Sequence, residues 1–259
     1  MGYFGLAVNV AMAVGPSLGL FLLSSFSFTV LFMGSAAIAL LSVFLAIPLP
    51  EVHTHVEHRE KRPPLFSREA LFPSVVVFMV TISYGAIVSF LPLFAKQRSI
   101  ENFALFFTVY SIVLIVFRVF SGRLSDVFGR RALVIPGLIG LAASMVLLSM
   151  TGSLIMLLIV AGLYGLAWGA VQPALMAQVT DLSNPNERGA CMATFTSAFD
   201  LGIGLGAMML GFLIQATSFS FTFLVTAGFA VIGIVIYIFG TSGKRQPAPC
   251  AVQDDQQRR

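Results

Sequence analysis

The residue whose type and position most suggest chemistry is Asp200, a carboxylate near the middle of the apolar stretch 190–214. A charged group at the centre of a bilayer costs at least about 2.5 kcal/mol, so such a residue is expected to have a function. Removal from water favours the neutral form, which suits Asp200 to bind and release a proton or to pair with a cationic ligand. The alternative is a neutral carboxyl group that hydrogen-bonds neighbouring helices.

A second ionisable side chain, Arg118, lies inside the apolar stretch 102–121, only four residues before Gly122. Its long stem could carry the guanidinium group to the aqueous boundary. It could instead face inward and form an ion pair with Asp126 or Asp181, or bind an anion. The residues alone leave these alternatives open.

Polar and aromatic residues recur at helical spacing in the stretch 154–179. Tyr164, Trp168, Gln172 and Gln178 follow one another at spacings of four, four and six, which predicts a polar and aromatic stripe. Trp168 and Gln172 fall mid-span, where such residues line water-filled cavities or make plain interhelical contacts. Tyr84 and Tyr110 are weaker candidates of the same kind, for which core packing is the main alternative.

Membrane helices must position these residues, because the composition excludes a soluble protein. Of 259 residues, 58% are hydrophobic and 10% are charged, against about 25% charged in soluble domains. No segment alternates polar and apolar residues as a membrane β-strand does, so helices are the expected spanning element. The sequence predicts an all-α membrane protein, a polytopic helical bundle of about eight transmembrane helices. The apolar stretches are 4–23, 28–49, 72–94, 102–121, 132–150, 154–179, 190–214 and 219–240.

The basic residues indicate how these helices are oriented. Connectors on one side hold twelve of the 15 Lys and Arg residues, whereas the other side holds only Lys96 and Arg98. We therefore expect the twelve-charge side, with both termini, to face the cytoplasm in a multi-pass plasma-membrane protein. The net charge of +4 is spread over these connectors, so the expected partner is a lipid bilayer and not a nucleic acid.

Metal and covalent chemistry have little support in the sequence. The three histidines, His53, His55 and His58, lie in one polar linker, and the two cysteines, Cys191 and Cys250, give no metal-ligand spacing. No phosphate-binding loop, metalloprotease helix or nucleophile elbow occurs. We expect no enzyme, no metal site and no cofactor.

A weak internal repeat relates the first two spans to the last two. Residues 26–31 recur almost unchanged at 219–224, an offset of 193, and the preceding helices align at an offset of 191. The second alignment sets Asn9 against Asp200, which makes Asn9 a further candidate. Such a duplication predicts counterparts of residues 68–191, about 124 residues, before Met1. We therefore expect a truncated chain whose missing N-terminal helices are needed for activity.

Polar breaks and the repeat together predict the domain organisation. Residues 1–50 would form the last two helices of an N-terminal bundle, and residues 51–69 a cytoplasmic linker that contains Pro63-Pro64. Residues 70–240 would form a C-terminal six-helix bundle, and residues 241–259 a cytoplasmic tail.

A family signature lies in residues 122–131, Gly-Arg-Leu-Ser-Asp-Val-Phe-Gly-Arg-Arg, which fill a short connector between two spans. They resemble the G-x-L-x-D-x-x-G-R-[KR] signature of the major facilitator superfamily. Glycine permits a tight turn, a carboxylate can bond helix-end amides, and arginines can meet facing carboxylates. The resemblance implies a conformational-switch loop made of Gly122, Asp126, Gly129, Arg130 and Arg131.

A second resemblance lies in residues 13–19. They are similar to the G-P-x-x-G motif in the fifth helix of exporters of this superfamily, through Gly15, Pro16 and Gly19. An ordinary packing groove is the alternative. The further glycine that often follows this motif is replaced by Leu20.

Together these resemblances imply helices five to twelve of a twelve-helix fold that works by alternating access. They imply a secondary active transporter, and we expect proton-coupled export of a small organic or drug-like compound. A nutrient or sugar uptake symporter is the alternative within transport. From another class, an inactive truncated fragment or a noncatalytic membrane subunit remains open.

Overall fold

The computed structural model describes residues 25–47, 67–184 and 187–242, with scattered residues between 11 and 23. Every regular element in these ranges is a helix, as the sequence predicted. The chain divides into two compact units, Met1–Pro64 and Leu65–Arg259. Asn9, Pro16 and the three histidines lie outside the described residues, as do most of the linker and the tail.

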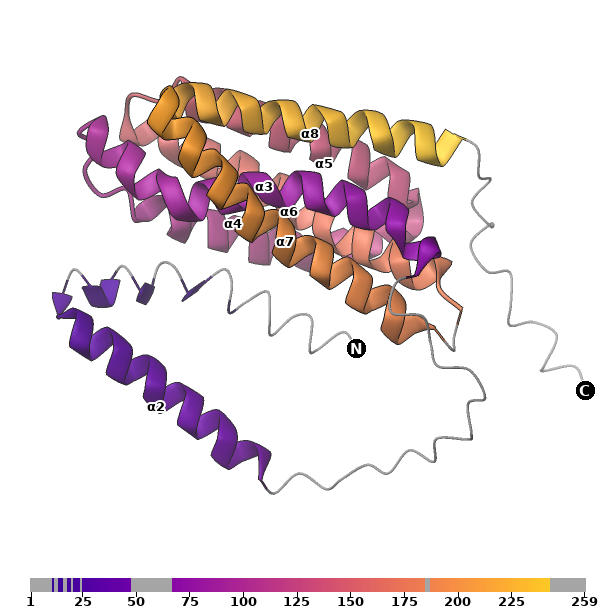
Figure 1. Ribbon diagram of the computed structural model, residues 1–259, viewed down its shortest axis with the longest axis horizontal. Helices are drawn as coiled ribbons and strands as arrows, with labels where there is room; N and C mark the ends of the chain where they lie inside the picture. The colour runs from indigo at the N-terminus through magenta and orange to yellow at the C-terminus, as the bar shows by residue number, and fades with distance from the viewer. Residues whose placement is uncertain are drawn as a thin grey trace, which may run out of the picture. The chain divides into compact units, whose positions relative to one another are not determined.

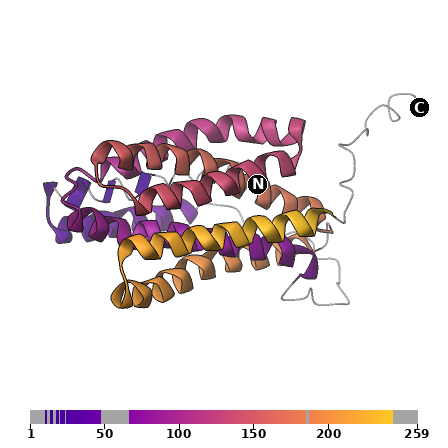
Figure 2. The same ribbon diagram turned by 90° about the horizontal axis from the view of Figure 1, so that it is seen from above.

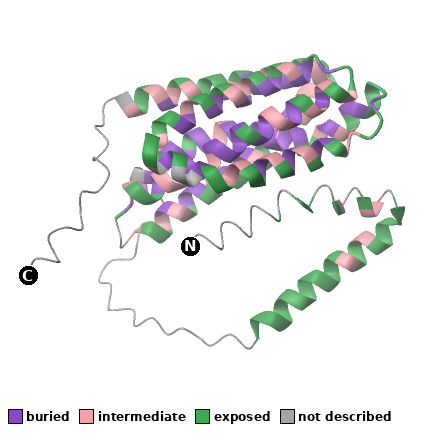
Figure 3. Ribbon diagram, turned by 180° about the vertical axis from the view of Figure 1, so that it is seen from behind, coloured by how far each residue is buried: buried purple, intermediate pink, exposed green. Residues whose placement is uncertain are grey.

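The described part of the first unit consists mainly of α2 (Phe28–Ala46). This helix has 19 residues without a charge, and none of them is buried (Figure 3). At 1.5 Å per residue it is about 29 Å long, which matches the hydrocarbon thickness of a bilayer. Gly15 and Gly19 are helical, and open space surrounds the position of a Cβ atom on either.

The described part of the second unit has six helices, which pack side by side as a bundle (Figures 1 and 2). They are α3 (Arg68–Gln97), α4 (Leu105–Phe128), α5 (Arg130–Ser149), α6 (Leu154–Leu182), α7 (Arg188–Ala216) and α8 (Phe219–Ser242). Helix α3 packs against α7, α8 and α6, whereas α6 also contacts α4 and α5. Buried side chains line the interior of this bundle and exposed ones cover its outside (Figure 3).

Length and hydropathy confirm the fold class. Six described helices are long and apolar enough to cross a membrane, and the apolar part of α4, Leu105–Ser121, is somewhat shorter. Several helices extend beyond the apolar stretches that the sequence marks. Helix α3 has 30 residues, or about 45 Å, which spans the headgroup layers as well as the hydrocarbon core.

The signature segment is mostly helical, which corrects the prediction of a connector over residues 122–131. Helix α4 continues to Phe128 and α5 begins at Arg130, so Gly129 alone separates them. Gly129 has φ 85° and ψ 154°, a conformation that is essentially restricted to glycine. Gly122 makes no turn, because the helix continues through residues 122–128.

A close crossing of α3 and α7 fixes the position of α7. A Cβ atom on Gly202 would collide with the Thr81 side chain and would lie 2.7 Å from the carbonyl oxygen of Phe78. One turn further, a Cβ on Gly206 would lie 3.0 Å from the Cα of Ile82. The two backbones therefore approach to a distance that only glycine allows on α7.

Both ends of α3 are also held. At its start, Cys191 Sγ donates to Ser67 Oγ at 3.1 Å and the Ser67 N–H donates to Thr194 Oγ1 at 3.2 Å. At its end, the Arg98 guanidinium donates to Ser220 Oγ at 3.1 Å, and Phe94 packs edge-on against Phe223 at 5.3 Å between ring centroids. These contacts tie α3 to the first turns of α7 and α8.

The helix boundaries agree with one of the two offsets of the internal repeat. Helices α2 and α8 begin at Phe28 and Phe219, which are 191 positions apart. This equals the offset that aligns the two preceding helices, whereas the six-residue match at an offset of 193 is displaced by two residues from the helix starts. Gene duplication and the assignment of residues 1–50 to another bundle stay predictions.

Candidate functional site

An aromatic cluster joins four helices in the middle of the bundle. Trp168 of α6 stacks on Tyr84 of α3 at 5.5 Å between ring centroids and on Tyr164 at 6.0 Å. Tyr164 also contacts Tyr110 of α4 at 5.8 Å, and Trp168 contacts Phe199 of α7 at 6.2 Å. All five side chains are buried. In the described structure they pack into the core of the bundle.

A polar contact joins the aromatic cluster to a neighbouring serine. The hydroxyl groups of Ser83 and Tyr164 lie 3.1 Å apart and share a hydrogen bond. This bond satisfies the phenol of a side chain that is fully buried, where a lost partner would be costly. The same hydroxyl of Ser83 also bonds the carbonyl of Val80 at 2.7 Å.

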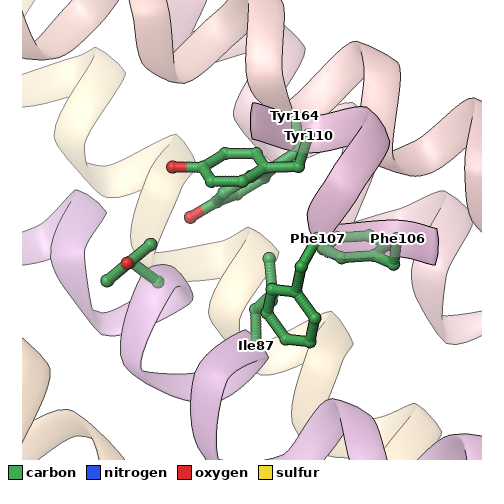
Figure 4. Close-up of a pocket in the computed structure, with 6 residues that line it drawn as sticks. Ile87, Phe106, Phe107, Tyr110 and Tyr164 are labelled. Carbon is green, nitrogen blue, oxygen red and sulfur yellow. The ribbon is translucent and has the colours of Figure 1, made fainter. Parts of the chain in front are cut away.

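A small pocket lies on one side of this cluster (Figure 4). Its volume of about 10 Å³ is at the lower limit for one water molecule. Figure 4 shows the rings of Tyr110 and Tyr164 with their hydroxyl groups pointing the same way. The lining residues are Tyr84, Ile87, Phe106, Phe107, Tyr110 and Tyr164. An organic ligand would need the surrounding helices to separate.

Arg118 and Gln172 form the polar end of the same helix pair. The Arg118 guanidinium donates a short hydrogen bond to the side-chain oxygen of Gln172. Both side chains are partly buried. Because Gln172 belongs to the neighbouring helix, the guanidinium points across to α6 and not along its own helix toward the aqueous boundary. This geometry contradicts the interpretation in which Arg118 extends freely to the boundary.

Arg130 pairs with Asp181, one of the two carboxylates that the sequence suggested as partners of Arg118. Its Nε lies 3.2 Å from Asp181 Oδ2 in an ion pair, and its Nη1 donates to Ser125 Oγ at 2.8 Å. Asp181 therefore pairs with Arg130 and not with Arg118, which was one of the alternatives for Arg118. Arg131 is exposed next to Arg130, and the side chain of Asp126 lies outside the described structure.

The predicted stripe on α6 holds for three of its four members. Tyr164, Trp168 and Gln172 are successive turns on the side that meets α4 and α3. Gln178 comes six residues after Gln172, and a step of six turns a helix by about 240°, away from that side. Its buried Oε1 has no hydrogen-bond partner among the described residues.

Asp200 lies on the exposed side of α7, thirteenth of its 29 residues and directly after Phe199. It is about 18 Å from the start of the helix, well inside the span. Within the described ranges no hydrogen bond or ion pair reaches its carboxylate. Thr196 and Ser197, one turn earlier, are also exposed. This side of α7 thus offers a carboxylate and hydroxyl groups near the aromatic cluster.

Phe199 and Ser83 were not predicted. Each stands beside a predicted candidate, Phe199 before Asp200 and Ser83 before Tyr84. Adjacency in sequence could have drawn attention to them. Their partners could not have been found that way, since Ser83 and Tyr164 are 81 positions apart on different helices.

Comparison with known proteins identifies the family. The model of the Major Facilitator Superfamily matches residues 1–107 and 75–254. The multidrug transporter protein MdtP of Bacillus subtilis is 26% identical over 129 residues, which cover 50% of this chain and 24% of that protein. An uncharacterized MFS-type transporter of Burkholderia mallei is 25% identical over 235 residues, or 90% of this chain and 57% of that protein.

A further relative is the uncharacterized transporter BU588 of Buchnera aphidicola. It is 27% identical over 153 residues, which cover 58% of this chain and 37% of that protein. The chain therefore spans at most a little over half the length of these relatives. The matched family model, the apolar helices and the signature around Gly129 show that the chain belongs to the major facilitator superfamily.

Proposed function

We propose that this chain is part of a proton-coupled exporter of a small organic or drug-like compound, working by alternating access. Family membership supports transport without covalent catalysis. The printed name of the Bacillus subtilis relative, a multidrug transporter, supports a drug-like substrate. The similarity of residues 13–19 to an exporter motif supports the outward direction.

The observation that carries the proposal is the position of Asp200. Its carboxylate is exposed about halfway along a membrane helix, and the neighbouring Phe199 contacts Trp168 of the aromatic cluster at 6.2 Å. Ionisable groups inside membrane helices commonly belong to proton or substrate pathways, and we propose that Asp200 carries the coupled proton. Movement of α7 would transmit the change in protonation to the aromatic cluster through Phe199.

The signature segment would control the conformational change. Arg130 joins the beginning of α5 to Asp181 near the end of α6 and to Ser125 near the end of α4. We propose that Arg131 and Asp126 complete the contacts that hold the inward-closed arrangement. We also propose that activity requires helices beyond this chain, because the aligned regions cover only 24% to 57% of the three relatives.

Membrane orientation belongs to the same proposal. We propose that twelve of the 15 basic residues, Gly129 and both termini share one side of the membrane. The positive-inside rule supports a cytoplasmic location of this side, and we propose that the membrane is the plasma membrane.

Export can be tested in bacteria that lack their own multidrug pumps, with ethidium as the probe. Cells that produce the chain as part of a complete transporter should accumulate less ethidium than cells without it, and a protonophore should abolish the difference. Asp200→Asn should remove the difference, whereas Asp200→Glu should retain part of it. Glu101→Gln is the matched control, since Glu101 is exposed in the turn between α3 and α4.

The outcomes separate the alternatives. Coupled export by Asp200→Asn at the wild-type level would contradict the assigned role of this carboxylate. Greater accumulation in producing cells would favour an uptake symporter. If the complete transporter exports ethidium and the chain alone, present in the membrane in equal amount, does not, the chain alone is an inactive fragment or a noncatalytic subunit.

A further inference from the structure

We propose that Arg118, positioned by Gln172, binds the carboxylate of a transported solute. The inference rests on the proposed function, because it assigns a substrate class to that transporter. The solute would be an organic acid with an apolar body.

The charge of Arg118 is not neutralised by any carboxylate whose side chain the structure describes. A guanidinium group has five N–H donors, and its one described partner is the side-chain amide of Gln172. That amide accepts a hydrogen bond but carries no negative charge. Asp181 is engaged by Arg130, and Asp200 has no described bond to Arg118.

The position of Arg118 keeps its charge inside the bundle. Arg118 lies in the last turn of the apolar part of α4, Leu105–Ser121, and the helix continues for seven more residues to Phe128. The guanidinium points sideways to α6, where Gln172 fixes one of its nitrogen atoms. An intramembrane cation held in this way requires a counter-ion or a water-lined cavity.

The geometry around Arg118 favours a carboxylate on an apolar body. The planar guanidinium can donate two parallel hydrogen bonds to a carboxylate while one nitrogen remains bonded to Gln172. One and two turns along α6 from Gln172 lie Trp168 and Tyr164, whose stacked rings offer an apolar surface when the helices separate. The polar and apolar parts thus lie on one side of α6.

The single tryptophan of the chain, Trp168, provides a direct binding signal one helical turn from Gln172. The purified full chain in detergent would be titrated with cyclohexanecarboxylate, which does not absorb at the excitation wavelength. Controls are cyclohexanecarboxamide, which has nearly the same shape without charge, and cyclohexylmethylammonium, which has the opposite charge. We expect a saturable fluorescence change with the carboxylate alone.

Three variants test the assignment to Arg118. Arg118→Gln should raise the half-saturating concentration by about tenfold or more, because a charged hydrogen bond is lost. Arg118→Lys should weaken binding less, since it keeps the charge but not the planar fork. Gln172→Ala should also weaken binding, as Arg118 loses its support. Arg98→Gln, which removes a basic residue at the far end of α3, should bind as the wild type does.

Several results would overturn the inference. They are equal responses to the carboxylate and the amide, wild-type affinity in Arg118→Gln, and binding only in Asp126→Asn, which would show that Asp126 supplies the counter-ion. Loss of the response in nanodiscs containing phosphatidylglycerol would assign the site to a lipid phosphate. If circular dichroism shows that Arg118→Gln does not fold, Arg118→Lys and Gln172→Ala still test the inference. Wild-type affinity in both of these variants would contradict it.

Failure of this inference is distinguishable from failure of the proposed function, because the titration requires no transport. Ethidium export without carboxylate binding would overturn only the inference. Carboxylate binding that depends on Arg118, without proton-dependent transport, would overturn only the proposed mechanism.

Discussion

Arg118 and Gln172 are 54 positions apart, and so are Tyr110 and Tyr164, another contacting pair between α4 and α6. Two contacts with one common offset require that the helices run in the same direction and in constant register. Tyr110 and Arg118 are therefore two turns apart on α4, opposite Tyr164 and Gln172 on α6. The aromatic cluster and the Arg118 guanidinium therefore lie along the same side of the α4–α6 pair.

The hydrogen bond between Ser83 and Tyr164 should stabilise the bundle. We expect Tyr164→Phe to lower the free energy of unfolding by about 0.5–1.5 kcal/mol, and the melting temperature by a few degrees. Tyr237→Phe is the matched control, since the hydroxyl of Tyr237 is buried without a described hydrogen-bond partner. Thermal melting in detergent measures both variants. Equal destabilisation of the two would contradict a specific contribution from Ser83.

The crossing of α3 and α7 should tolerate no methyl group at Gly202. We expect Gly202→Ala to destabilise the bundle by about 1–3 kcal/mol, because its Cβ would collide with Thr81. Gly204→Ala should be neutral or slightly stabilising, since nothing lies within 4 Å of its Cβ position and alanine favours helix. Comparing their melting temperatures isolates the packing effect. A milder effect at Gly202 than at Gly204 would refute the close crossing.

The junction of α4 and α5 should require glycine at position 129. Gly129 has φ 85°, and a side chain in this region costs about 1–3 kcal/mol. We expect Gly129→Ala to reduce the amount of folded protein recovered by size-exclusion chromatography after mild heating. Gly152→Ala, in the turn between α5 and α6, has open space around it and should behave as the wild type does. Recovery of Gly129→Ala at the level of Gly152→Ala would argue against the backbone requirement.

The two cysteines allow a test of the orientation of the membrane protein. Cys191 is fully buried against Ser67, whereas Cys250 lies in the C-terminal tail sequence. A membrane-impermeant maleimide should label Cys250 in inverted membrane vesicles and not in intact cells, if the tail is cytoplasmic. Cys191→Ala should leave this labelling unchanged, and Cys250→Ala should remove it. Labelling of Cys250 in intact cells would reverse the predicted orientation.

The fold could be predicted from the sequence because it depends on composition and on the spacing of charges. Long uncharged stretches require helices in a bilayer, and the signature around Gly129 resembles that of the family that the comparisons confirmed. The helix ends were harder to place. Arg123 and Asp126 indicate where the chain meets water, but a helix continues through the headgroup layer, so α4 extends to Phe128.

The partners of the candidate residues depend on packing that no local pattern encodes. Arg118 could reach a carboxylate in either of two connectors, and only the register of α4 against α6 decides for Gln172. Asp181 meets Arg130 for the same reason. The roles of Asn9, Pro16 and Asp126 stay predictions, because these positions or their side chains lie outside the described structure.

The single-residue junction at Gly129 has a mechanical consequence. A connection of one residue keeps the end of α4 and the start of α5 side by side, whereas residues 98–104 give α3 and α4 a longer connection. A tilt of α4 that shifts its C-terminal end therefore also displaces the start of α5. Through the ion pair of Arg130 with Asp181, the same tilt is passed to the end of α6. Helices α4, α5 and α6 would then tilt together.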